Sequence, residues 1–180
     1  MKFANVLAWI LLMASICTAE ESVTAWKDPE CSFYKKQSNY SARQLISTFL
    51  KLDSEGGFVN SAKIEEFALC PGHQGGGDSF EVINGFSIVK ENIGKESSEF
   101  VVKFQKLGTV TSGGRDGSLN SFIKSQQSDE VLFKLAKTPF GWRIDFKNTH
   151  IPKVLRKNAE KVLPHKDWVK GERQLFESER

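Results

Sequence analysis

Features that define several common classes of protein are scarce or missing in this chain of 180 residues. Its 25 lysines and arginines nearly balance its 22 aspartates and glutamates, which leaves a net charge of +3. A chain so close to neutral gives no general case for binding nucleic acid or another polyanion. Beyond the N-terminal segment, no apolar run approaches the roughly 20 residues that a membrane span requires. We therefore expect no nucleic-acid partner and no transmembrane span.

Sequence motifs typical of hydrolases, phosphate-binding loops and metal sites are absent as well. The form G-x-S-x-G of a hydrolase nucleophile is missing, so the glycine-rich segment 72–78 is interpreted as a connector. The glycine-rich turn 112–117 lacks the lysine of a phosphate-binding loop. His150 and His165 have no third ligand at a familiar metal spacing. We expect no catalytic motif, no metal and no cofactor.

The N-terminus has the pattern of an export signal. Lys2 is the only charge before Glu20, and an apolar stretch covers residues 6–16. Cys17 and Ala19 are small enough for signal peptidase, which predicts cleavage after Ala19. The apolar stretch is too short for a membrane anchor, and a lipid on Cys17 is disfavoured by the bulky residue before it. The mature chain is therefore expected to be secreted or periplasmic.

Two cysteines remain after this cleavage, Cys31 and Cys70. An even pair in an exported chain predicts one disulfide. It would close a loop of about 40 residues and contribute roughly 4 kcal/mol by the chain-entropy argument. The alternative is a reactive thiol at Cys70 with His73 as its basic neighbour, but one neighbour is weak support.

Apolar residues have helical spacing between about Ser41 and Pro71. Ser41 begins a capping box, and apolar residues recur every three or four positions over 41–52, which predicts a helix. Asn60 or Ser61 is expected to cap a second, shorter helix, which Pro71 stops.

Apolar and polar residues alternate in the part of the chain that follows. This pattern predicts strands over 100–111, 131–135 and 142–146, the last two joined as a hairpin. Asn84-Gly85 fits either a tight hairpin turn or a bulge within one long strand. Segment 118–127 fits either a helical turn or a strand.

From Asn148 the pattern becomes helical again and predicts an amphipathic helix up to Pro164. Its basic residues are expected on one face, where a solvated surface is the default. Contact with an anionic membrane surface or an acidic partner is the sharper alternative. The residues concerned are Lys153, Arg156, Lys157 and Lys161.

The order of helix, helix and strands, closed by Val131-Leu132-Phe133-Lys134-Leu135 and Gly141-Trp142-Arg143-Ile144, resembles the exported bacterial members of the NTF2-like superfamily, over about residues 41–147. The resemblance implies an α+β fold, in which N-terminal helices pack on a curved antiparallel sheet, the cystatin-like cone. The chain then divides into a signal peptide (1–19), the cone domain (20–147) and a basic helical C-terminal extension (148–180). A pocket at the wide end of the cone would be lined by residues that equally suit a plain core: Phe100, Val102, Phe104, Phe133, Trp142 and Ile144.

Three functions are compatible with these features. The first is a non-enzymatic binding protein that holds a partner protein or a small apolar ligand. The second is an enzyme of the NTF2-like type with His73 or Asp145 as its base. The third is an interaction module that acts through the basic C-terminal helix. A fold alone does not decide among them, and nothing in the sequence indicates an oligomeric state.

Overall fold

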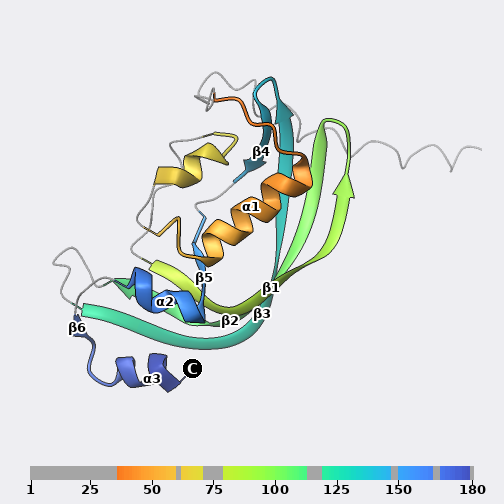
Figure 1. Ribbon diagram of the computed structural model, residues 1–180. Helices are drawn as coiled ribbons and strands as arrows, with labels where there is room; N and C mark the ends of the chain where they lie inside the picture. Colours follow the sequence, from red (N-terminus) through yellow and green to blue (C-terminus); the bar gives the residue numbers. More distant parts are fainter. Residues whose placement is uncertain are drawn as a thin grey trace, which may run out of the picture.

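The computed structural model describes residues 36–59, 62–70, 79–112, 119–146, 150–163 and 167–178. The elements are α1 (Ala42–Ser54), the 3-10 helix η2 (Ala62–Glu66), β1 (Ser79–Ile93), β2 (Ser97–Ser112), β3 (Leu119–Thr138), β4 (Gly141–Asp145), β5 (Lys153–Leu155), α2 (Arg156–Val162), β6 (Asp167–Trp168) and α3 (Glu172–Ser178). The strands form a strongly curled sheet, and α1 lies in its hollow (Figure 1).

Helix α1 begins at the predicted capping box. The Gln44 main-chain N–H donates to the Ser41 hydroxyl at 3.2 Å, and the Ser41 N–H donates to the Gln44 side-chain oxygen at 2.9 Å. These two bonds satisfy donors that a helix start leaves unpaired. The apolar spacing places Leu45, Ile46 and Phe49 on the side that faces the sheet, where each is at most 1 % exposed. The predicted first helix is thus confirmed, whereas the second, shorter one is the 3-10 helix η2.

The sheet has the strand order β4-β3-β2-β1-β5, and β6 pairs with β3. Neighbours from β1 to β4 are antiparallel, but β5 runs parallel to β1 and β6 runs parallel to β3. The sheet is therefore mixed and not purely antiparallel as expected. The difference arises from β5 and β6, both in the segment that the sequence pattern assigned to a helical extension.

Strand β1 settles the alternative left open at Asn84-Gly85. It is one continuous strand, and its register with β2 shifts between Ile83 and Gly85. The dipeptide is therefore a bulge, not a hairpin turn; bulges increase the local twist and bend a strand. Segment 118–127 is likewise decided, since β3 begins at Leu119 and extends through it.

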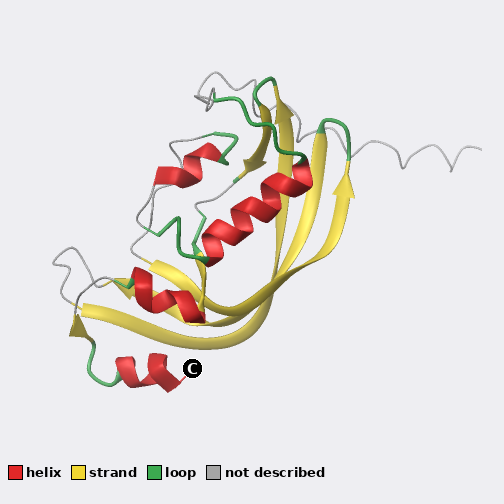
Figure 2. Ribbon diagram, viewed as in Figure 1, coloured by secondary structure: helices red, strands yellow, loops and turns green. Residues whose placement is uncertain are grey.

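Apolar side chains form two buried clusters, because the first part of β1 is covered on both faces. The first cluster joins α1 and η2 to the concave face through Phe49, Phe58, Phe67, Phe100, Phe104, Phe133 and Trp142, among others. The second cluster joins the other face to α2 and α3 through Phe80, Val82, Val110, Phe122, Val154, Ala159 and Phe176. Figure 2 shows the consequence: α1 and α3 lie on opposite sides of the sheet.

The C-terminal segment differs most from its sequence pattern. The helix expected from Asn148 starts only at Arg156, because residues 153–155 form β5 and pair with Glu81–Ile83. The Glu81 N–H also donates to the Pro152 carbonyl at 2.8 Å. A buried strand edge needs such main-chain partners, and the sheet supplies them here. Two short helices do follow, so the helical part of the expectation holds in shortened form.

Several predictions fall outside the described residues: the export signal over 1–19, the Cys31 half of the disulfide, the helix cap at Asn60 or Ser61, the stop at Pro71, and segment 72–78 with His73. The described helices include none that is long and apolar enough to span a membrane.

Candidate functional site

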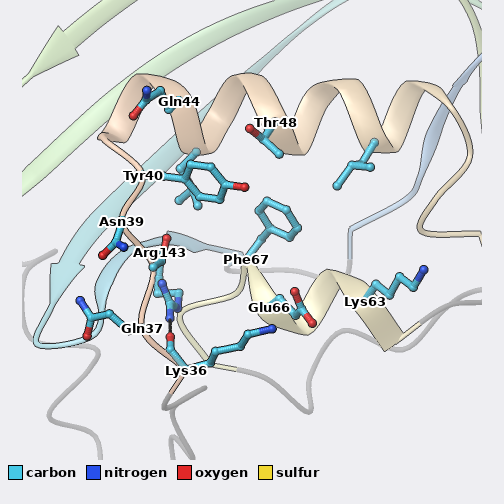
Figure 3. Close-up of a pocket in the computed structure, with 13 residues that line it drawn as sticks. Lys36, Gln37, Asn39, Tyr40, Gln44, Thr48, Lys63, Glu66, Phe67 and Arg143 are labelled. Atoms are coloured by element: carbon cyan, nitrogen blue, oxygen red, sulfur yellow. Dashed lines mark hydrogen bonds between the residues drawn. The ribbon is translucent and has the colours of Figure 1, made fainter.

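A hollow of about 580 Å³ opens between α1, segment 36–40 and η2, and we call it the α1–η2 pocket. Its volume lies within the range of roughly 300–1,000 Å³ found for small-molecule sites. Figure 3 shows the side chains around it. Those with charges or rings are Lys36, Tyr40, Lys63, Glu66, Phe67 and Arg143.

One wall of the pocket is held in place by Arg143 of β4. This side chain is 2 % exposed, and its Nη2 donates to the Lys36 carbonyl oxygen at 2.6 Å while Nη1 donates to the Trp142 carbonyl oxygen at 2.7 Å. The Ser38 N–H donates to the Phe140 carbonyl oxygen at 2.9 Å. Segment 36–40 is therefore bonded to the β3–β4 hairpin at two points before α1 begins.

The hairpin turn is shaped to receive that segment. Thr138 Oγ1 donates to the Gly141 carbonyl at 2.8 Å and accepts from the Phe140 N–H at 3.1 Å. Gly141 has a φ of 102°, which favours glycine, and a Cβ there would collide with the Ser38 carbonyl oxygen. The glycine permits both the turn and the close approach of segment 36–40.

The remaining walls come from α1 and from the end of η2. Gln44 and Thr48 belong to the lining from α1, and the Tyr40 ring lies beneath the first turns of the helix with its hydroxyl directed inward (Figure 3). Phe67 is fixed because the Ile144 N–H donates to its carbonyl at 2.7 Å. The adjoining Ala68 forms a parallel bridge to Ile144. Four separate parts of the chain thus build one hollow: segment 36–40, α1, the η2 region and β4.

The lining combines positive charge with aromatic surface. Among the described lining residues, Lys36, Lys63 and Arg143 are cationic and Glu66 is the only carboxylate, so their formal sum is +2. The Ser38 hydroxyl oxygen, also in the lining, is buried and has no hydrogen-bond partner within the described ranges. Buried polar atoms are almost always hydrogen-bonded. Such a site can hold a ligand that brings both polar and apolar groups.

The six residues expected to line a cone pocket are placed in the first buried cluster instead. None of Phe100, Val102, Phe104, Phe133, Trp142 and Ile144 is more than 9 % exposed, and none lines the α1–η2 pocket. They pack against α1, as in the plain-core alternative. The actual lining has little signal in the sequence, because the residues before Ser41 show no period and Lys63 and Glu66 lie in a short 3-10 helix.

The four C-terminal basic residues do not share an exposed face. Lys153 lies in β5 and is buried against the sheet, where its ammonium group donates to Glu81. Arg156 is also buried; it lies 3.9 Å above the Phe176 ring and donates to the Phe176 carbonyl at 2.9 Å. Lys157 and Lys161 are exposed. Half of the expected basic surface is therefore used inside the fold.

A buried ionic cluster forms where β5 joins β1. The Glu81 carboxylate accepts from Lys106 at 2.7 Å and from Lys153, and both lysine side chains are at most 12 % exposed. Burial by itself raises the pKa of Glu81. The hydrogen bonds and charges of the two lysines outweigh burial, so the pKa lies below its ordinary value of 4.5. This cluster fixes the strand junction.

A second buried polar pair lies at the C-terminal end of α1. Asp53, 1 % exposed, has an Oδ2 that lies 2.9 Å from His150 Nε2 and accepts from the Lys153 N–H at 3.2 Å. The His150 ring packs against Phe49 and Phe146. Such a histidine–carboxylate pair resembles acid–base machinery, but it is enclosed by core residues and attaches segment 150–153 to α1.

The other candidates for chemistry do not converge. Asp145, the proposed base, ends β4 opposite Lys134 and does not line the α1–η2 pocket. Within the described ranges, no three His, Cys, Asp or Glu side chains are grouped to hold a metal ion.

Comparisons with known proteins assign no family to the chain, so its class is described by the fold alone. No protein-family model matches the chain, and neither curated proteins nor solved structures yield a match. Over the residues that the structure describes, the chain is an α+β protein: one N-terminal α-helix lies in the hollow of a curled mixed sheet, and two short helices follow toward the C-terminus.

Proposed function

We propose that this chain is a non-enzymatic binding domain of the NTF2-like type, exported from the cell interior, and that it holds a small ligand in the α1–η2 pocket. The carrying observation is the hollow of about 580 Å³, whose walls are fixed by the bonds from Arg143 and Ser38. A site whose walls are already ordered loses little conformational freedom when a ligand binds.

The packing of the sheet favours the α1–η2 pocket over the interior of the cone as the ligand site. The concave face is occupied by its own aromatic side chains; Phe49 alone lies within 6 Å of the ring centroids of Phe58, Phe67 and Phe133. A ligand on that face would have to displace them. The α1–η2 pocket requires no such displacement.

The experiment fills the hollow with a side chain. Thr48 lines the pocket from the middle of α1, so Thr48→Trp would occupy it, whereas the neighbouring Ser47 is exposed and outside the lining. Ser47→Trp is therefore a matched control on the same helix. The probes are two fluorescent dyes of similar shape, anilinonaphthalene sulfonate and the uncharged N-phenylnaphthylamine.

We expect the wild type and Ser47→Trp to bind at least one dye at a single saturable site, and Thr48→Trp to bind at least tenfold more weakly with an unchanged melting temperature. If the wild type binds neither dye, or if Thr48→Trp binds as well as Ser47→Trp, the proposed function is wrong.

The two other functions have less support. An enzyme with Asp145 as base would need that carboxylate in a pocket, and the second candidate, His73, is outside the described residues. An interaction module based on the basic C-terminal segment would rely on Lys157 and Lys161, since Lys153 and Arg156 are bound internally.

A further inference from the structure

The charge of the α1–η2 pocket identifies the kind of ligand it favours. Among the described residues that line the hollow, three side chains are cationic and one is a carboxylate, although the whole chain is almost neutral. The excess is local and does not follow from composition. A ligand with one negative charge would reduce this excess, whereas a cationic ligand would increase it.

The position of Arg143 strengthens this preference. Its guanidinium is almost fully buried and donates to the carbonyl oxygens of Trp142 and Lys36. Because charges interact more strongly away from bulk water, the charge of this guanidinium affects a ligand in the hollow more than an exposed charge would.

Neutral polar groups add hydrogen-bonding capacity beside these charges. The Ser38 hydroxyl oxygen is buried without a partner among the described residues, and its O–H can donate to an acceptor in the hollow. A carboxylate or sulfonate oxygen is such an acceptor. This is an independent indication, because it depends on an unsatisfied buried group and not on the sum of charges.

The rest of the lining favours a ligand whose body is apolar and preferably flat. Tyr40 is 46 % exposed, although it lies at the pocket, and Phe67, Leu45 and Leu52 also contribute to the lining. An exposed ring beside a hollow can be covered by a ligand with gain of apolar burial and of ring-to-ring contact.

We infer that the ligand class is a small organic acid with an aromatic or otherwise flat apolar body. Its acidic group lies toward Lys36, Lys63 and the Ser38 hydroxyl, and its apolar body lies against Tyr40. This inference rests on the proposed function, because it assigns a ligand class to the same pocket.

The same two dyes test the inference, since they differ chiefly in the sulfonate group. We expect anilinonaphthalene sulfonate to bind the wild type about tenfold more tightly than N-phenylnaphthylamine at low salt. Raising the salt concentration from 20 mM to 500 mM, roughly a fivefold shortening of the Debye length, is expected to reduce that difference.

A charge-removal variant locates the effect. The double variant Lys36→Gln, Lys63→Gln is expected to raise the Kd of the sulfonate dye about tenfold and to leave that of the neutral dye within about twofold. Lys51→Gln is the control, because Lys51 lies on α1, is exposed and does not line the pocket.

The outcomes separate the two claims. Tighter binding of the sulfonate dye that is lost in the double variant but kept in Lys51→Gln supports the organic-acid class. Equal or tighter binding of the neutral dye, or an unchanged sulfonate Kd in the double variant, overturns that class while the pocket itself stands. Failure of both dyes to bind, or binding that Thr48→Trp does not weaken, overturns the pocket and the class together.

Discussion

The guanidinium of Arg143 donates a hydrogen bond of 2.6 Å to the main-chain carbonyl of Lys36, which lies 107 positions earlier in the chain. The bond joins the closing hairpin of the sheet to the segment that precedes the first helix. Both the pocket wall and the start of α1 depend on this junction.

Replacement of Arg143 should therefore affect stability and binding together. Arg143→Met keeps much of the volume but leaves the Lys36 and Trp142 carbonyls without their charged donor, and we expect unfolding to become easier by about 3 kcal/mol. Urea denaturation measures this, and the affinity for the sulfonate dye should fall in parallel. Arg43→Met removes only an exposed ion pair to Glu91, so a loss under about 1 kcal/mol is expected. Equal losses in the two variants would show that the Arg143 junction is unimportant.

Two glycines with positive φ provide a matched test of the close approach at the hairpin. Gly141 has a φ of 102° and Gly171 a φ of 87°, but only at Gly141 would a Cβ collide with another segment, at the Ser38 carbonyl. Gly171→Ala should cost about 1 kcal/mol from backbone strain alone. Gly141→Ala should cost at least about 2 kcal/mol and weaken dye binding, because segment 36–40 must move. If Gly141→Ala is no worse than Gly171→Ala, the contact does not constrain the wall.

Glu81 should make stability depend on pH in acid. Its pKa in the fold lies below the ordinary 4.5, so its contribution is fully present above that pH and is lost as the pH falls through the value in the fold. Glu81→Gln removes this component and leaves two buried lysines without their carboxylate, which should cost about 3 kcal/mol at neutral pH.

Denaturation of Glu81→Gln at a series of pH values between 7 and 3 should accordingly give a shallower acid decline than the wild type. Glu91→Gln is the control, because the Arg43–Glu91 pair is exposed at the surface. An identical acid slope in the wild type and Glu81→Gln would contradict the role assigned to this carboxylate.

The C-terminal helix should be part of the cooperative fold. Phe176 is 2 % exposed, contacts the rings of Phe122 and Trp168, and lies beneath Arg156. Phe176→Ala should lower the free energy of unfolding by about 3–5 kcal/mol, because it leaves a cavity in the second buried cluster. Leu175→Ala, at a half-exposed neighbour, should cost under about 1 kcal/mol. Thermal unfolding that is the same for both variants would show that α3 is only an appendage.

The sequence was sufficient to predict those helices and strands whose pattern lies within one short stretch of the chain. Ser41 and Gln44 predicted the start of α1, and alternation predicted the strands that became β2, the end of β3, and β4. The spacing after Asn148 was misleading, because Lys153 and Val154 fit a helical stripe as well as they fit a strand. Only their partners in β1, more than 70 positions earlier, decide the outcome.

The pocket could not be read from the sequence for a related reason. Its lining is drawn from an irregular segment, one face of α1, a 3-10 helix and a β4 arginine, so no single stretch has a recognisable motif. Arg143 alternates with apolar neighbours, a pattern typical of a solvated face, yet it is buried and bonded to the Lys36 carbonyl. Burial of that kind depends on tertiary contacts that periodicity does not encode.

The parallel pairing of β5 with β1 also has a kinetic consequence. Strand β1 is complete by Ile93, but the neighbour of its Glu81–Ile83 stretch enters the chain only at Lys153. Non-local pairings of this kind are formed late and slow the folding of a domain. A chain that is synthesised from its N-terminus must hold the first strands with one edge uncovered until Lys153 has been added. The two buried clusters share those strands, so the domain gains its full stability only when the residues from Lys153 onward arrive.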